Sequence, residues 1–242
     1  MQHPDEERVG YDYVSPGLIE IPRPDEQFPH SVRRTMPRII GDPHAWYHHQ
    51  TGITNGYLNQ DESLLLYNTA RQFEGRRALE IGSARGWSAW YTLRAGLHVS
   101  MCEPGFADQE TFQGIMGAIQ EFEGRWWMTA VPSPAGVLEA ARWHFPFSFV
   151  LIDGNHDLPY PAIDAVTVHY CCAPDAVVML HDCWSPGVRD ALKLLQAFGW
   201  QAGVYRTSGL FGVAWRGSAR PVKHIADPAM PARDIPKELL LS

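Results

Sequence analysis

The sequence has few cysteines and no apolar run long enough to cross a membrane. Only four of its 242 residues are cysteine, and their spacing fits neither a zinc pattern nor a disulfide framework: Cys102, Cys171, Cys172 and Cys183. No segment reaches the roughly 18 consecutive apolar residues that span a bilayer. Met1 to Gly10 is polar and acidic and has no signal-peptide core. We therefore expect a cytoplasmic protein with reduced thiols in or near its core and no membrane partner.

The sequence also lacks a basic run and the common nucleotide-binding fingerprints. Its 20 lysines and arginines are outnumbered by 27 aspartates and glutamates, which gives a net charge of −7. Binding of nucleic acid through phosphate contacts is therefore not expected. The absence of Gly-x-Gly-x-x-Gly and of Gly-Lys-Ser/Thr excludes the dinucleotide fingerprint and the P-loop. A small molecule is the partner class that fits best.

One stretch carries the strongest ligand signal, Ala78 to Ser88, which reads Ala-Leu-Glu-Ile-Gly-Ser-Ala-Arg-Gly-Trp-Ser. It predicts a short buried strand, a glycine turn and the start of a helix. Gly82 and Gly86 flank the turn, and glycine permits backbone angles and close ligand approach that a Cβ atom would prevent. Free amide groups at a helix start favour polar or anionic ligand groups. The pattern indicates a nucleotide-like ligand site, although plain α/β proteins also contain such turns.

From residue 77 onward, strand and helix patterns alternate. The apolar runs Phe147 to Ile152 and Ala176 to Leu180 predict central parallel strands, and the crossovers predict right-handed βαβ units. The last two strands are joined by Thr207-Ser208-Gly209 alone, which requires an antiparallel hairpin. We expect an α/β fold: a Rossmann-like, doubly wound, seven-stranded sheet, mostly parallel with one antiparallel strand. The expected strands are 77–82, 97–103, 126–131, 147–153, 175–181, 200–206 and 210–216, and the expected helices are 86–95, 107–121, 134–143, 159–171 and 187–198.

The chain divides into three regions. Residues 1–53 form an irregular, proline-rich arm that would cover the active site as a lid or meet a second subunit, so a homodimer is compatible with the sequence. Residues 54–216 form the ligand-binding domain, which begins with a helical pattern over Leu64 to Phe73. Residues 217–242 are polar and are predicted to be a C-terminal tail with a short helix near Pro236 to Leu241.

Polar residues follow the predicted parallel strands at the edge where open α/β sheets bind ligands. The first three strands end at Glu80 to Ser83, at Glu103 and near Ser133, and the next two deliver Asp153, His156, His181 and Asp182. Isolated charges at such apolar strand ends would be costly to bury. A divalent cation would offset the repulsion between Asp153 and Asp182, and carboxylates with one imidazole suit Mg²⁺ or Mn²⁺.

The turn Glu80 to Ser88 resembles the first motif of class I methyltransferases that depend on S-adenosyl-L-methionine (SAM), and the resemblance extends over 54–216. Asp-Gly-Asn-His-Asp at 153–157, with His181-Asp182 and Gly-Val-Arg-Asp at 187–190, is similar to the metal-dependent small-molecule O-methyltransferases. These include the catechol O-methyltransferase-like group and, more closely, the branch with sugar O-methyltransferases and cephalosporin-hydroxylase-like proteins. The resemblance implies methyl transfer from SAM to a hydroxyl of a small molecule in secondary metabolism.

The resemblance also implies roles for individual residues. Five residues of the turn would seat the methionine part of SAM: Glu80, Gly82, Ser83, Gly86 and Ser88. Glu103 would hold the ribose, Ser133 would lie by the adenine edge, and Asp153 would also face the cofactor. Asp153, His181 and Asp182 would hold the cation and thereby the acceptor. His156 would be the general base, because an imidazole can take a hydroxyl proton near neutral pH.

Simpler interpretations stand beside these. Glu103 is also explained as a turn acid, Ser133 as a helix cap and His156 as a structural histidine. His181 departs from the Asp-Asn or Glu-Asp pair that the resembled family often has at this strand end, so a metal-free cluster of side chains hydrogen-bonded to each other or to substrate is an alternative. The alternative functions are a SAM-fold enzyme of hydroxylase-like, rearrangement or cyclisation chemistry and a non-catalytic SAM-binding partner.

Overall fold

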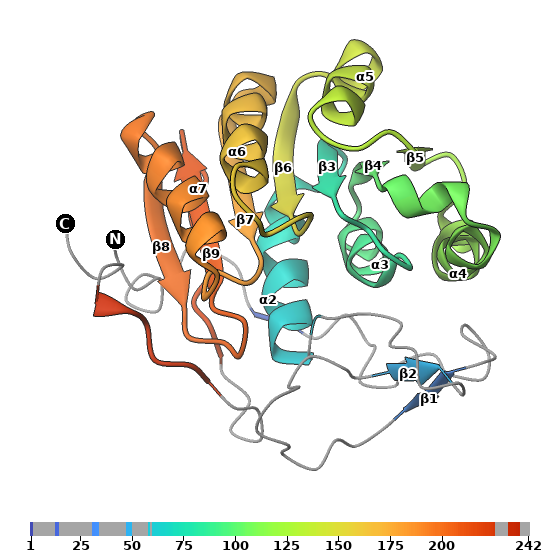
Figure 1. The fold of residues 1–242 in the computed structure, drawn as a ribbon, viewed down its shortest axis with the longest axis horizontal. Coiled ribbons are helices and arrows are strands. Elements are labelled where there is room, and N and C mark those ends of the chain that lie inside the picture. The colour runs from blue at the N-terminus through green and yellow to red at the C-terminus, as the bar shows by residue number, and fades with distance from the viewer. Residues whose placement is uncertain are drawn as a thin grey trace.

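The computed structural model describes residues 1, 13–14, 31–33, 47–49, 58, 60–225 and 232–237, and every structural statement below concerns these residues. Its main feature is a seven-stranded sheet with the spatial order β5-β4-β3-β6-β7-β9-β8 (Figure 1). The strands are β3 (Arg77–Ile81), β4 (His98–Cys102), β5 (Trp126–Thr129), β6 (Phe147–Ile152), β7 (Cys172–Leu180), β8 (Gln201–Tyr205) and β9 (Phe211–Arg216). A separate antiparallel pair joins β1 (Ser31–Arg33) and β2 (Tyr47–His49).

Helices cover both faces of the sheet because alternate strand residues are apolar on each side. One core holds the apolar residues of α2, α3 and α4 against the sheet, and the other holds those of α5, α6 and α7. The helices are α2 (Gln60–Ala70), α3 (Trp87–Arg94), α4 (Gln109–Ile119), α5 (Ala135–His144), α6 (Tyr160–Cys171) and α7 (Pro186–Ala197), with single 3₁₀ turns η3 (Arg71–Phe73), η4 (Pro104–Ala107) and η5 (Gln120–Phe122). No helix in the described part of the chain is long and apolar enough to cross a membrane.

The topology confirms the expected mixed sheet. Strands β5, β4, β3, β6 and β7 are parallel, and β9 is antiparallel to both of its neighbours, β7 and β8. The short connection 206–210 makes the β8–β9 pair a hairpin, as the sequence requires. The expected start of β7 at residue 175 is wrong, because the strand begins at Cys172, directly after α6. An irregularity in the β6–β7 register accompanies the early start and leaves room for Pro174 in the strand.

The segment after β9 is packed against the domain. Ala219, Val222 and His224 are buried. The Tyr205 hydroxyl donates to the carbonyl oxygen of Val222 (2.8 Å), and His224 Nε2 lies 2.8 Å from Asp61 Oδ1 on α2. The first part of the predicted tail thus packs against α2. Most of the arm 1–53 and of the helix expected near 236–241 lies outside the described residues.

Candidate active site

A cavity of about 730 Å³ lies at the carboxyl ends of the parallel strands. This is the edge at which open α/β sheets bind ligands, and the volume is within the usual range for small-molecule sites. Six predicted site residues line it: Gly82, Glu103, Ser133, Asp153, His156 and Asp182. The neighbouring lining residues include Asn155, Tyr160 and Asp164, which the sequence did not single out as ligand contacts.

The glycine turn at the end of β3 is closely packed against the loop after β6. Gly82 has a φ of 85°, and a Cβ atom there would overlap the backbone of Asp153 and lie 2.8 Å from Gly154 Cα. Gly86 has a φ of 81° and is the N-cap residue of α3. Both positions therefore require glycine for backbone reasons, in addition to any close approach of a ligand.

Glu80 lies beneath this turn and is fully buried. Its Oε1 accepts a hydrogen bond from the Ser88 hydroxyl (2.6 Å), which links β3 to the first turn of α3. Burial raises the pKa of Glu80 to about 8, and the Ser88 and Ser83 hydroxyls oppose this shift. Glu80, Ser83, Gly86 and Ser88 are not among the residues that line the cavity, so their contact with a ligand stays a prediction.

Glu103, at the end of β4, holds two loops together. Its Oε1 accepts from the Gly105 amide (2.8 Å), and its Oε2 accepts from the Ala84 amide (3.0 Å). The carboxylate is thus a turn acid, as the simpler interpretation proposed. It also lines the cavity, and each carboxylate oxygen can accept a second hydrogen bond, so ribose binding is compatible with this geometry.

Ser133 donates a hydrogen bond to Asp164 Oδ1, from the other side of the cavity. Asp164 lies on α6 and is 3% exposed. Burial raises its pKa to about 6, and the Ser133 hydroxyl opposes that shift. Asp164 was missed in the sequence, although an acid surrounded by apolar residues in a helix is a signal of a buried polar site.

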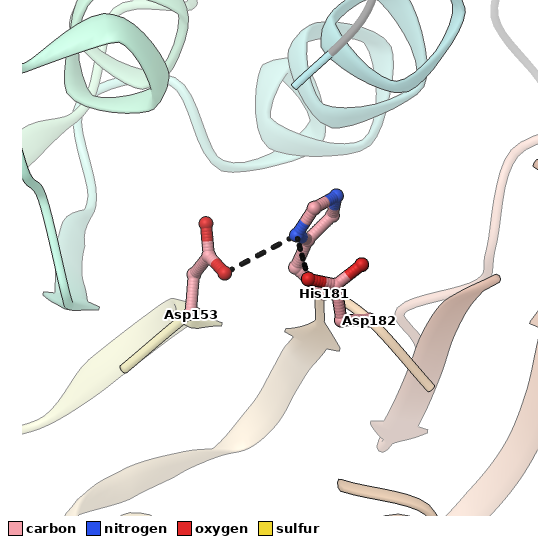
Figure 2. A group of neighbouring side chains, drawn as sticks. All are labelled: Asp153, His181 and Asp182. Carbon is pink, nitrogen blue, oxygen red and sulfur yellow. Dashed lines mark hydrogen bonds and ion pairs between the residues drawn. The ribbon is translucent and has the colours of Figure 1, made fainter. Parts of the chain in front are cut away.

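Asp153, His181 and Asp182 meet at the ends of β6 and β7 (Figure 2). His181 Nδ1 lies 3.2 Å from Asp153 Oδ1 and 3.5 Å from Asp182 Oδ2. Burial lowers the pKa of His181, but the carboxylates of Asp153 and Glu62 outweigh this effect and hold the pKa well above its usual range. Asp182 has a φ of 58°, a backbone conformation that is uncommon outside glycine and typical of functional sites.

His156 lies beside the same two carboxylates. Its Nε2 is 3.6 Å from Asp153 Oδ1, and its Nδ1 is 3.7 Å from Asp182 Oδ2. The nearby carboxylates of Asp153 and Asp182 raise the pKa of His156, although partial burial opposes the shift. The ring lines the cavity, so it is placed to exchange a proton with a bound ligand.

Two further residues complete this cluster and were not predicted. Glu62, on α2, lies with its Oε2 3.3 Å from His181 Nε2. Trp184 Nε1 donates to Asp182 Oδ1 (2.8 Å), and the guanidinium of Arg233 lies 5.0 Å from the Trp184 ring centre. The sequence gave no sign of the bond between Trp184 and Asp182. Acids at a helix start are usually solvated, so nothing local in the sequence distinguished Glu62.

Comparison with known proteins rests on structure, because no protein-family model matches the chain and no curated protein matches its sequence. An O-methyltransferase from Bacillus cereus, solved with SAH, aligns over 66% of this chain and 82% of its own with a TM-score of 0.58 and 17% identity. The O-methyltransferase TomG from Streptomyces achromogenes, solved with SAM, also aligns over 66% of this chain and 82% of its own, with a TM-score of 0.51 and 20% identity. Precorrin 8w decarboxylase from Methanobacterium thermoautotrophicum aligns over 65% of this chain and 90% of its own, with a TM-score of 0.54 and 10% identity. The fold is that of the SAM-dependent methyltransferases.

The methyltransferase fold implies a cofactor pocket and, in the metal-dependent branch that the sequence resembles, a cation. The acidic cluster, which consists of Asp153, His181 and Asp182, has the donor atoms that bind a cation. Each residue offers one ligand atom, and these three atoms lie within 4.8 Å of one another. Two carboxylates and an imidazole suit Mg²⁺ or Mn²⁺ with water filling the shell. The same atoms also lie near hydrogen-bonding distance of one another, so the metal-free alternative is compatible as well.

Proposed function

We propose that this protein transfers a methyl group from SAM to a hydroxyl oxygen of a small molecule. One observation carries the proposal: a single cavity connects the glycine turn and Glu103 with Asp153, His156 and Asp182. A cofactor at the first group of residues and an acceptor at the second would therefore share one enclosed space. Neighbouring structures of O-methyltransferases with SAM or SAH support this assignment.

In this proposal the chain binds SAM, orients the acceptor toward it and removes a proton from the acceptor hydroxyl. SAM supplies an already activated methyl group, so alignment of the acceptor is the main task of the protein. Gly82, Glu103 and Ser133 hold the cofactor, with Glu80, Ser83, Gly86 and Ser88 behind the turn. His156 takes the hydroxyl proton of the acceptor. Asp153 and Asp182 raise the pKa of His156, and a divalent cation on these carboxylates would oppose that effect and favour the neutral imidazole that serves as the base.

The proposal includes a divalent cation, Mg²⁺ or Mn²⁺, held by Asp153, His181 and Asp182. When bound, such a cation lowers the pKa of a hydroxyl that it contacts. The position of His156 beside both carboxylates would keep the base close to that hydroxyl.

We extend the proposal to the setting of the reaction. The acceptor is a secondary metabolite, which is supported by the structural likeness to TomG, a protein of tomaymycin synthesis. All four cysteines are free and buried, which supports a reducing compartment such as the cytoplasm. Exposed apolar side chains on α5 and α6, Trp143 at 67% and Tyr170 at 71%, support a homodimer.

The test is a binding and transfer experiment with methyl-labelled SAM. We expect calorimetry to detect SAM and SAH binding and labelled product to form from a panel of hydroxylated small molecules, with activity lost in EDTA and restored by Mg²⁺ or Mn²⁺. Glu103→Ala should weaken SAM binding by roughly 10-fold or more, since hydrogen bonds to a charged group are worth about 1.5–3 kcal/mol.

Glu121→Ala is the matched control, because Glu121 is likewise a glutamate that accepts a hydrogen bond, from Trp90 Nε1 (3.0 Å), and it does not line the cavity. Folded parent protein that binds neither SAM nor SAH would overturn the proposal. Equal SAM affinity in the parent and Glu103→Ala would remove Glu103 from the binding site. Indifference of the parent to EDTA would overturn the cation part alone.

A second candidate keeps the fold and changes the reaction. The likeness to precorrin 8w decarboxylase favours it, because that protein has the same fold under a name that describes a different chemistry. In this case the acids and histidines of the cluster would act on the substrate directly, in a hydroxylase-like, rearrangement or cyclisation reaction, or the chain would bind SAM without catalysis. Label in the product would support methyl transfer, and conversion without label would support the second candidate.

A further inference from the structure

Glu62 is a buried acid that belongs to no strand end. It lies in the first turn of α2, is 0% exposed, and contacts the cluster from the side opposite Asp153. Its Oε1 accepts from the Gly209 amide (2.7 Å) and from the Ser208 hydroxyl (3.3 Å), and its Oε2 faces His181. A buried carboxylate is costly unless it is fully paired, so these contacts fix the orientation of both oxygens.

The two nitrogens of His181 face different partners. Nε2 is 3.3 Å from Glu62 Oε2, whereas Nδ1 faces Asp153 and Asp182 (Figure 2). A neutral imidazole carries one proton, and a carboxylate can only accept it. A cation that replaces the Nδ1 proton would leave the remaining proton on Nε2, donated to Glu62, and the lone pair of Nδ1 would then point toward the two aspartates. A lone pair and two carboxylates around one point make a donor set for a cation.

We propose that Glu62 is a positioning residue that sets the tautomer of His181, so that the Nδ1 lone pair can bind a divalent cation together with Asp153 and Asp182. This inference rests on the cation part of the proposed function. The His181 ring lies between Glu62 on α2 and the strand ends, and one ligand atom of each of the three residues lies within 4.8 Å of the other two. Partners of this kind, which bond to the second nitrogen of a metal-binding histidine, typically change metal affinity by about 10–100-fold.

Glu62→Gln tests the proposal with a minimal change of shape. The oxygen of the amide would keep the firmer bond from the Gly209 amide, which turns the amide NH₂ toward His181 Nε2. A donor at that position requires Nε2 to accept, so the proton of the neutral ring moves to Nδ1 and blocks the cation. We expect the dissociation constant for Mn²⁺, measured by electron paramagnetic resonance on the full chain, to rise by about 10–100-fold.

A second readout follows the tautomer itself. In ¹⁵N-histidine-labelled protein, the parent with saturating Mg²⁺ should show His181 protonated at Nε2, and Glu62→Gln should show it protonated at Nδ1. The spectrum of His181→Gln identifies the signals of this ring among those of the 11 histidines. A merely structural role of Glu62 would lower stability and leave the tautomer unchanged.

Asp61→Asn is the matched control. Asp61 precedes Glu62 on α2, is also buried, and pairs with an imidazole, His224 Nε2 at 2.8 Å. This variant removes an equivalent buried carboxylate–imidazole pair, and it should keep the Mn²⁺ affinity and the His181 tautomer of the parent. Parent-like Mn²⁺ binding by Glu62→Gln, or equal losses in both variants, would overturn the inference and leave the proposed function intact. A parent that binds SAM but no Mn²⁺ would overturn the inference together with the cation part.

Discussion

At the scale of single residues, Glu80 couples the stability of the fold to pH. Its pKa is about 8 in the folded protein against 4.5 for an ordinary glutamate. As pH rises from about 4.5 to 8, the unfolded chain has released the proton that the folded chain still holds, so the free energy of unfolding must fall over this window.

Glu80→Gln should remove this pH dependence. Glutamine has the shape of the protonated acid and keeps an acceptor for the Ser88 hydroxyl. We expect the variant to be as stable as the parent near pH 5 and more stable near pH 8, by on the order of a few kcal/mol. Urea unfolding at the two pH values measures this, with the exposed Glu123→Gln as the control. Parallel pH profiles of the parent and Glu80→Gln would contradict the assignment.

Substitution of Gly82 and of Gly75 by alanine distinguishes the cost of backbone strain from the cost of steric overlap. Both have a positive φ, 85° and 74°, but a Cβ atom on Gly75 would meet nothing within 4 Å, whereas one on Gly82 would overlap Asp153. Gly75→Ala should cost only about 1–2 kcal/mol of unfolding free energy. Gly82→Ala should cost several kcal/mol more or fail to fold, because β3 and β6 would be forced apart. Equal urea midpoints for the two variants would show that the loop after β6 can move away.

At the scale of elements, the turn between β8 and β9 packs against the acidic cluster and against Glu62. A Cβ atom on Gly209 would lie 2.8 Å from Asp182 Oδ1 and 3.0 Å from both His181 Nε2 and Glu62 Oε1. Gly209→Ala should therefore displace these side chains while the hairpin keeps its strand pairing. We expect methyl transfer and Mn²⁺ affinity to fall at least 10-fold, with the urea midpoint close to that of the parent. Unchanged activity would mean that the cluster is not the reaction site.

The sequence predicts the elements of the sheet closely because their signals are local. Apolar runs and the glycines that end them lie within a few residues of each other, so most strand and helix limits agree with the structure to within two residues. Pro174 hid the early start of β7, since proline usually interrupts a strand. The meeting of Asp153 with His181 and Asp182 followed from the parallel order of their strands.

The contacts from outside the sheet could not be predicted in this way. Glu62 and His181 are separated by 119 positions, and only the packing of α2 on the sheet brings them together. Asp164 likewise meets Ser133 across 31 positions through the packing of α6. The sequence thus indicated which strand ends meet at one cavity, whereas the prediction missed Glu62 and Asp164, which contact these strand-end residues from helices.

At the scale of the whole molecule, the chain after β9 returns to α2 and to the 3₁₀ turn that follows it. Gln72 Nε2 donates to the carbonyl oxygen of Arg220 (2.8 Å), and His224 pairs with Asp61. Removing residues 217–242 would leave the Asp61 carboxylate buried without its imidazole, which is strongly destabilising. We expect the shortened chain to unfold at lower urea concentration, and an unchanged midpoint would show that this contact is dispensable.

The neighbouring positions of Asp61 and Glu62 have a consequence for control of the enzyme. Asp61 pairs with His224 in the segment after β9, and Glu62 contacts His181 in the proposed cation site. A protease cut after Arg216 would spare the residues proposed to bind the cation and the whole glycine turn, yet it would remove His224 from its pair with Asp61. Such a clipped protein should keep its cofactor and its cation while it stays folded but should unfold more readily, so the lifetime of the active protein would depend on a segment remote from the chemistry.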